Sequence, residues 1–209
     1  MNELDVERTL HDEWQAFVAA ARPDPALGVT TVEARGTRIT RPVLWAELED
    51  VRLAFAEIHA ALDEPSKADV LATTRWSVKD LIAHIASWAA EFRRQIETAA
   101  AGDAFDYLIT FTPRVGPTEW NAREVDRRRA LSLDDRFREL DAETARIQEL
   151  ALTLPDDVLF MTAELPQTPD GLPEHRWRTR LADLMLMKCF HDRYHLDRIR
   201  DLLGLDIVD

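Results

Sequence analysis

The chain has 209 residues, of which 46% are hydrophobic and 31% charged, and its formal net charge at pH 7 is −13. A chain of this length can bury a sizeable core, but its acidity argues against a general nucleic-acid binder, because attraction to phosphates requires a cationic surface. No apolar stretch approaches the roughly 20 residues that a membrane span needs, and no secretory leader opens the sequence. The single cysteine, Cys189, precludes an internal disulfide, so we expect a cytoplasmic protein.

The first 41 residues are predicted to form an extension that packs on the rest of the chain. Residues 3–21 have the pattern of a short amphipathic helix, which a proline-rich stretch ends. Residues 28–40 alternate in polarity around Arg35-Gly36, and this pattern indicates a small hairpin.

Residues 42–209 are predicted to form one domain of amphipathic helices. Apolar residues recur with a helical period in four stretches. These stretches run from Pro42 to Leu62, from Ser77 to Ala101, from Trp120 to Leu152 with a break near Ser132, and from Thr179 to Leu203. Because glycine and β-branched runs are scarce as well, we expect an all-α, up-and-down-type four-helix bundle with an extra N-terminal segment.

The second of these stretches has the clearest start signal in the sequence. In "WSVKDLIAHIASW", Ser77 is placed to cap the helix, and Asp80 completes a capping box three residues later. Trp76 and Leu81 occupy the two positions of a hydrophobic staple. Asp80 also lies one turn before His84 and is a candidate to orient that imidazole, although we favour its capping role.

Two histidines, His191 and His195, lie four residues apart in the last predicted helix. Residues at this spacing share a helix face, so both imidazoles can point at one metal ion. Six histidines in 209 residues give about 0.2 such pairs by chance, so the pair alone does not establish a site. His84, which borders the apolar stripe of its own helix, is a candidate third ligand. A lone buried histidine is more often bonded to a backbone carbonyl, but a facing helix with two more imidazoles favours a divalent-metal site.

Three segments carry a resemblance to a known family. The stretches "RWSVKDLIAHIASW" and "HDRYHLDRIRDLLG" resemble the DinB superfamily of four-helix-bundle metalloenzymes in their helix start, helix-two histidine and final H-x-x-x-H. The segment "TEWNAREVDRRRALSLDDRFREL", residues 118–140, is similar to the third helix of such proteins, and the resemblance spans about residues 43–204. It implies that His84, His191 and His195 bind one metal ion, most often zinc or nickel, near one mouth of the bundle.

The resemblance also implies a class of function. The superfamily includes thiol-dependent isomerases and transferases that use mycothiol or bacillithiol. It therefore implies a homodimeric, metal-dependent thiol transferase that acts on a small molecule in detoxification, with a low-molecular-weight thiol as cofactor. An open three-histidine site can lower the pKa of bound water toward ~7 or deliver a coordinated thiolate, so a metal-dependent hydrolase is an alternative. A non-catalytic bundle that sequesters a small molecule or binds a partner is another, and no general base can be assigned.

Two residues are candidates for contact with the substrate. Arg198 continues the stripe formed by His191 and His195 and can grip a carboxylate, although an ion pair with a nearby surface acid is an equal alternative. Trp88, one turn after His84, is predicted to line the pocket, with simple core packing as its alternative.

Three further features receive non-catalytic interpretations. The H-D-x-x-H spelling of residues 191–195 is similar to the H-E-x-x-H of zinc peptidases, but too few residues follow for the downstream ligand of that class. Cys189 lies on the apolar side of its helix and is interpreted as a buried small hydrophobe. The basic run Arg127–Arg129 has acidic neighbours and is interpreted as a solvated helix face.

Overall fold

A computed structural model gives the structure of most of the chain. It describes residues 21–24, 29–32, 39–62, 65–73, 76–102, 117–160, 162–165 and 177–205. The helix that the sequence predicts at residues 3–21 lies outside the described residues, apart from its last position.

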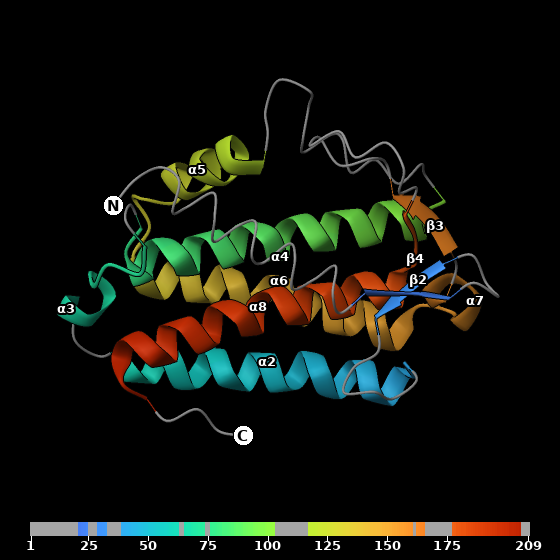
Figure 1. Cartoon of the computed structure of the whole chain (residues 1–209), viewed down its shortest axis with the longest axis horizontal. Helices are drawn as coiled ribbons and strands as arrows, with labels where there is room; N and C mark the ends of the chain where they lie inside the picture. The colour runs from blue at the N-terminus through green and yellow to red at the C-terminus, as the bar shows by residue number, and fades with distance from the viewer. Residues whose placement is uncertain are drawn as a thin grey trace.

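Four long helices form the body of the molecule (Figure 1). They are α2 (Arg41–Ala61), α4 (Val78–Ala100), α6 (Leu133–Thr153) and α8 (Leu181–Leu203). They correspond to the four predicted stretches, except that the third stretch divides into a separate α5 (Pro117–Arg127) and α6 near Ser132, where the break was predicted. Two single-turn helices, α3 (Pro65–Ala68) and α7 (Asp156–Leu159), lie in the connections.

Ion pairs define how the long helices run relative to one another. Each of α2 and α8 packs against α4 or α6 as well as against the other, so the four helices enclose one interior. Arg93 of α4 bonds to Glu143 of α6, and Arg146 of α6 bonds to Glu97 of α4 at 2.9 Å. Both helices advance together along these contacts, so α4 and α6 are parallel.

Two more pairs of neighbours run in opposite directions, whereas α2 and α8, like α4 and α6, are parallel. His59, near the end of α2, bonds to Asp134 at the start of α6 at 2.9 Å, so these two helices are antiparallel. His84, early in α4, contacts His191 at the middle of α8, and Arg198 further along α8 donates to the carbonyl oxygen of Ala72 before α4, so α4 and α8 are antiparallel too. The predicted four-helix bundle is confirmed, but its up-and-down order is interrupted between α4 and α6. The long connection that contains α5 returns the chain before α6 begins, which lets the two helices run parallel.

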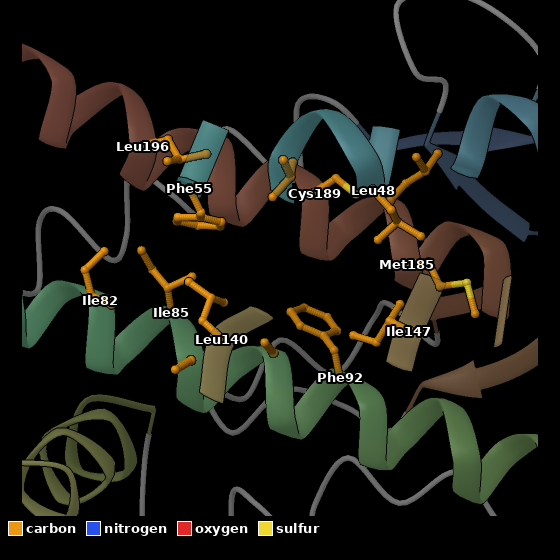
Figure 2. Packing of buried hydrophobic residues seen from close by; sticks show 14 of the residues in the cluster. Leu48, Phe55, Ile82, Ile85, Phe92, Leu140, Ile147, Met185, Cys189 and Leu196 are labelled. Atoms are coloured by element: carbon orange, nitrogen blue, oxygen red, sulfur yellow. The ribbon is translucent and has the colours of Figure 1, made fainter. Parts of the chain in front are cut away.

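The interior of the bundle is apolar, and all four long helices contribute to it. Figure 2 shows side chains from α2 (Leu48, Phe55), α4 (Ile82, Ile85, Phe92), α6 (Leu140, Ile147) and α8 (Met185, Cys189, Leu196) that gather in one interior. Burial of a leucine, isoleucine or phenylalanine contributes about 1.5–3 kcal/mol, so these stripes stabilise the fold and fix which helix faces turn inward. Residues that interrupt a stripe, such as His84, are carried into the interior with it.

Local capping explains where the helices start and stop. Ser77 accepts a hydrogen bond from the backbone N–H of Asp80, whose carboxylate accepts from the N–H of Ser77 in return. Ser132 and Asp135 form the same capping box at the start of α6. Gly204 ends α8 with φ 64°, a left-handed conformation that glycine adopts without strain. The predicted capping role of Asp80 is therefore confirmed.

Two short antiparallel strand pairs accompany the helices. Strand β1 (Ala21–Asp24) pairs with β2 (Val29–Val32), and β3 (Thr162–Leu165) pairs with β4 (Trp177–Arg180). Strand β2 thus pairs with residues that precede it, whereas Arg35-Gly36, around which the sequence predicts a hairpin, lies outside the described residues. These four-residue strands leave the all-α assignment of the bundle unchanged.

No helix among the described residues is long and apolar enough to cross a membrane. The division of the chain into an extension, residues 1–41, and a bundle domain, residues 42–209, stays a prediction.

Candidate metal centre

The three predicted histidine ligands lie together between α4 and α8. His84 comes from α4, and His191 and His195 come from successive turns of α8. One nitrogen from each ring lies within 4.8 Å of the other two, and the Nε2 atoms of His84 and His191 are 3.3 Å apart. The sequence spacing allows His191 and His195 to face one point, and the antiparallel packing of α4 and α8 brings His84 to the same point.

Burial keeps two of these imidazoles neutral. His84 and His195 are 0% and 2% exposed. Burial lowers the pKa of both imidazoles well below the ordinary value of 6.5, and the neighbouring His191 lowers it further. A neutral imidazole has a free nitrogen lone pair at neutral pH, which is the form that binds a metal ion.

The donor set fits a divalent metal ion. Two nitrogen ligands at about 2.1 Å from one tetrahedral zinc ion stand about 3.4 Å apart, close to the separation of His84 and His191. The Nδ1 atom of His84 is buried and has no hydrogen-bond partner among the described residues. The alternative interpretation of His84, a core histidine bonded to a backbone carbonyl, is therefore not supported: no carbonyl in the described part of the chain accepts a hydrogen bond from this Nδ1 atom. Zinc and nickel both accept imidazole nitrogen, so the chemistry of the site suits either.

A buried ion pair adjoins His191. The Nδ1 atom of His191 lies 3.1 Å from Oδ1 of Asp192, and Nζ of Lys188 donates to Oδ2 of the same carboxylate at 2.5 Å. The side chains of Lys188 and Asp192 are both fully buried. Asp192 occupies the place of the glutamate in H-E-x-x-H, but this pairing commits its carboxylate inside the helix bundle, which argues further against a peptidase.

Aromatic side chains surround the histidines on the side of α4 and α5. The ring of Trp76 lies 5.1 Å from that of His84, and the ring of Trp88 lies 5.8 Å from that of His191. Trp88 donates from Nε1 to Oδ1 of Asn121 in α5 at 2.9 Å and contacts Trp120 at 4.9 Å between ring centroids. Trp88 therefore adjoins the histidines and joins α4 to α5, while its predicted contact with a substrate stays a prediction.

Arg198 has a backbone partner in the structure. Its Nε and Nη2 atoms donate to the carbonyl oxygen of Ala72 at 2.9 and 2.6 Å. This contact joins α8 to the segment before α4 and takes two of the donors of the guanidinium. The predicted role of Arg198 as an anchor for an anionic substrate stays a prediction, and it rests on the remaining donors.

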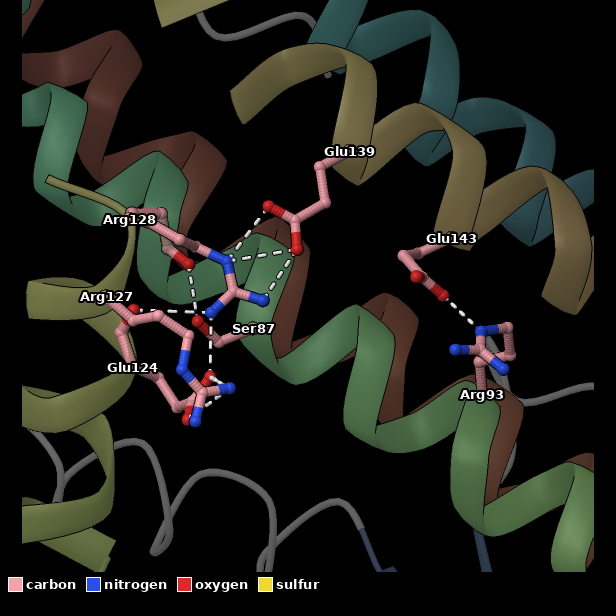
Figure 3. Close-up of polar contacts among 8 residues, drawn as sticks. Ser87, Arg93, Glu124, Arg127, Arg128, Glu139 and Glu143 are labelled. Atoms are coloured by element: carbon pink, nitrogen blue, oxygen red, sulfur yellow. Dashed lines mark hydrogen bonds and ion pairs between the residues drawn. The ribbon is translucent and has the colours of Figure 1, made fainter. Parts of the chain in front are cut away.

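A second group of polar residues lies at the junction of α4, α5 and α6, away from the histidines. Figure 3 shows Arg128 between Glu139, which it contacts with Nε and Nη2, and Glu124, which it contacts with Nη1 at 2.8 Å. Arg128 is 8% exposed. Burial works against its charge, but the hydrogen bonds that the guanidinium donates to both carboxylates outweigh this and raise its pKa. The solvated-face interpretation is thus wrong for Arg128, while Arg127 and Arg129 are exposed.

Sequence reasoning missed Arg136, which is the most deeply buried arginine among the residues that the structure describes. Arg136 is 1% exposed, and it donates to the carbonyl oxygens of Lys79 at 2.6 Å and Arg129 at 3.1 Å. Its Nη1 atom also lies 3.5 Å from the carboxylate of Asp80. An arginine in a highly charged helix normally indicates a solvated face. Arg136 is enclosed because the short turn before α6 places the carbonyl of Arg129 against its guanidinium, which the sequence pattern does not show.

The structure confirms the interpretation of Cys189. The thiol is buried, and burial raises its pKa to about 12, so it stays protonated at neutral pH and is a poor nucleophile.

The sequence matches the mycothiol maleylpyruvate isomerase N-terminal domain family over residues 44–186, more than half of the chain. The chain belongs to this family. The match includes His84 but ends before His191 and His195, so the ligands from α8 rest on the geometry described above. The predicted membership of the DinB superfamily is confirmed.

A solved structure shows the same fold. The chain is similar to YfiT from Bacillus subtilis, with 14% sequence identity and a TM-score of 0.61 over 84% of this chain and 95% of the other. YfiT is described as a probable metal-dependent hydrolase with an unusual four-helix bundle topology. At this identity the likeness establishes the fold alone. No curated protein matches the chain.

Proposed function

We propose that the protein is a metal-dependent enzyme in which His84, His191 and His195 bind one divalent ion, zinc or nickel. The observation that carries this proposal is the convergence of three imidazole nitrogens within 4.8 Å, two of them from fully enclosed rings. Three neutral ligands leave the double positive charge of the ion uncompensated, so it supplies Lewis-acid chemistry that activates a bound thiol or water.

We propose thiol-dependent transfer to a small electrophile as the reaction, with detoxification as its purpose. Membership of the mycothiol maleylpyruvate isomerase N-terminal domain family supports a thiol of the mycothiol or bacillithiol type as cofactor. Hydrolysis is the second candidate, because the structurally similar YfiT is described as a metal-dependent hydrolase. We place the enzyme in the cytoplasm, where such thiols are kept reduced.

The residues around the histidines have separate tasks in this proposal. Trp88 and Trp120, held by the hydrogen bond of Trp88 to Asn121, shield the site from water and offer apolar contact to a substrate. Arg198 binds an anionic group of the substrate or thiol with the donors that Ala72 leaves unused. We expect a homodimer, which light scattering at micromolar concentrations tests directly.

The experiment is a panel of small electrophiles offered with and without mycothiol, bacillithiol or glutathione. Each reaction is run with metal-loaded protein, with chelated protein and with the His195→Ala variant. Thiol-dependent turnover that disappears on chelation supports the transferase, and turnover without thiol supports the hydrolase. Activity that survives both chelation and loss of His195 refutes a metal mechanism. Ligand binding that chelators leave unchanged, without turnover, assigns the protein to the non-catalytic class.

A further inference from the structure

His191 has a carboxylate beside its second ring nitrogen. Its Nδ1 atom lies 3.1 Å from Oδ1 of Asp192, while its Nε2 atom faces Nε2 of His84 at 3.3 Å. A carboxylate oxygen can only accept a hydrogen bond, so the Nδ1 atom must carry the proton. A neutral His191 in this arrangement has its lone pair on Nε2, the atom that faces the other two histidines.

The carboxylate itself is held in place by a buried cation. Lys188 donates to Oδ2 of Asp192 at 2.5 Å, and neither side chain has any exposure to solvent. Because the two residues are four apart in α8, the helix fixes the pair and leaves Oδ1 directed at His191. A buried ion pair is a poor device for stability, since apolar side chains of similar volume stabilise a protein equally well or better. Its position beside His191 offers a different reason for its presence.

We propose that Asp192, held by Lys188, is a positioning residue that sets the tautomer and ring orientation of His191, so that Nε2 is presented to the metal ion. The inference rests on the proposed function for the metal, but the tautomer is a property of the metal-free protein. Carboxylates that accept the second N–H of a metal-binding histidine raise its basicity and fix its ring, and their loss typically weakens metal binding 10- to 100-fold.

The first test replaces Asp192 with asparagine and follows the ring nitrogens of His191 by long-range ¹H–¹⁵N NMR in metal-free protein. In the wild type we expect the proton on Nδ1. In Asp192→Asn, the amide must turn its oxygen toward the ammonium of Lys188, so its NH₂ group donates to Nδ1 of His191 and the proton moves to Nε2. A wild-type His191 with its proton on Nε2, or an unchanged tautomer in the variant, overturns the proposal.

The second test removes the ion pair without leaving a charge unpaired, in case Asp192→Asn does not fold. The double variant Lys188→Met/Asp192→Leu retains an apolar helix interior and is expected to fold. Its affinity for Zn²⁺, measured by calorimetry, should fall 10- to 100-fold. The matched control is Arg180→Met/Asp183→Leu, which removes another ion pair, 2.8 Å between Nε of Arg180, the residue before α8, and Oδ2 of Asp183 in its first turn.

The control should bind Zn²⁺ with wild-type affinity whatever it loses in stability. An equal loss of affinity in both double variants, or none in Lys188→Met/Asp192→Leu, refutes the positioning role. If the wild type takes up neither Zn²⁺ nor Ni²⁺, the proposed function fails, whereas the NMR experiment still decides the tautomer. The two ideas can therefore fail separately.

Discussion

Two regions of this bundle enclose groups of polar side chains, and the two groups are built on different principles. At the junction of α4, α5 and α6, Arg128 and Arg136 are enclosed, and carboxylates or backbone carbonyls accept their hydrogen bonds. Between α4 and α8, His84 and His195 are equally enclosed, but they face each other and His191. In the first region the charged groups bond to protein acceptors. In the second region the ring nitrogens converge on a point that a cation can occupy.

The difference matters because burial alone does not distinguish structure from function. An enclosed arginine that donates to several acceptors stabilises its surroundings, and its loss leaves those acceptors without hydrogen bonds, although Nε of Arg136 itself has no partner among the described residues. Three neutral imidazoles offer three lone pairs, and a single metal ion placed among them can accept all three at once. Variants in the two regions should therefore separate stability from metal binding.

The largest effect is expected from loss of a histidine ligand. His195→Ala should weaken binding of Zn²⁺ by more than about 100-fold, because loss of a direct ligand exceeds the 10- to 100-fold cost of losing its hydrogen-bonded support. Metal content of the purified protein and calorimetry both measure this. His59→Ala is the matched control: His59 bonds to Asp134 and stacks on Phe137, outside the cluster, so its loss should leave metal content at about one ion per chain.

A loss of stability without a loss of metal binding is expected at the junction of α4, α5 and α6, here called the arginine junction. Arg136→Met should lower the free energy of unfolding by about 3 kcal/mol, since it leaves two backbone carbonyls and the partly buried Asp80 without their donor. Urea unfolding of metal-free protein measures the loss, and Zn²⁺ affinity should stay within twofold of the wild type. A variant that keeps its stability but loses metal would erase the distinction between the two regions.

The histidine region could be predicted from the sequence more fully than the arginine junction, for physical reasons. His191 and His195 share a helix face by spacing alone, and the capping box at Ser77 fixes the register of α4, so His84 could be assigned as their partner. What the spacing could not supply was the side-chain detail: the ion pair of Lys188 with Asp192 depends on rotamers that only the packed bundle selects.

The remaining differences arise where tertiary packing overrides a local signal. Arg128 belongs to a run of three arginines whose pattern predicts a solvated face, but the turn after α5 places its side chain between Glu124 and Glu139. The parallel course of α4 and α6 depends on the length of a connection and not on either helix.

The histidine region should also respond to pH in a way that the arginine junction does not. The folded protein holds His84 and His195 with pKa values well below 6.5, chiefly because of burial, so the unfolded chain binds protons more readily. Their contribution to stability is complete above about pH 6.5 and declines as the pH falls below it, by up to about 1.4 kcal/mol per pH unit for each.

Urea unfolding of chelated protein at pH 7.5 and 5.5 measures this decline. His195→Asn cannot take up that proton, so its stability should fall less between the two pH values than that of the wild type. Cys189→Ala, which alters a buried residue of α8 without removing a group that titrates in this range, should fall as much as the wild type. Equal declines in all three proteins would show that the enclosed histidines do not resist protonation.

The smallest effects compare two copies of one motif. Ser77 caps α4, which carries His84, and Ser132 caps α6, and each is paired with an aspartate three residues later. Removal of a serine cap costs about 1 kcal/mol. The box at Ser77 is partly buried and its Asp80 also meets Arg136, whereas the box at Ser132 is exposed, so Ser77→Ala should cost more than Ser132→Ala. Because His84 lies almost two turns inside α4, both variants should bind Zn²⁺ like the wild type; a loss of affinity in Ser77→Ala alone would show that the start of α4 positions the site.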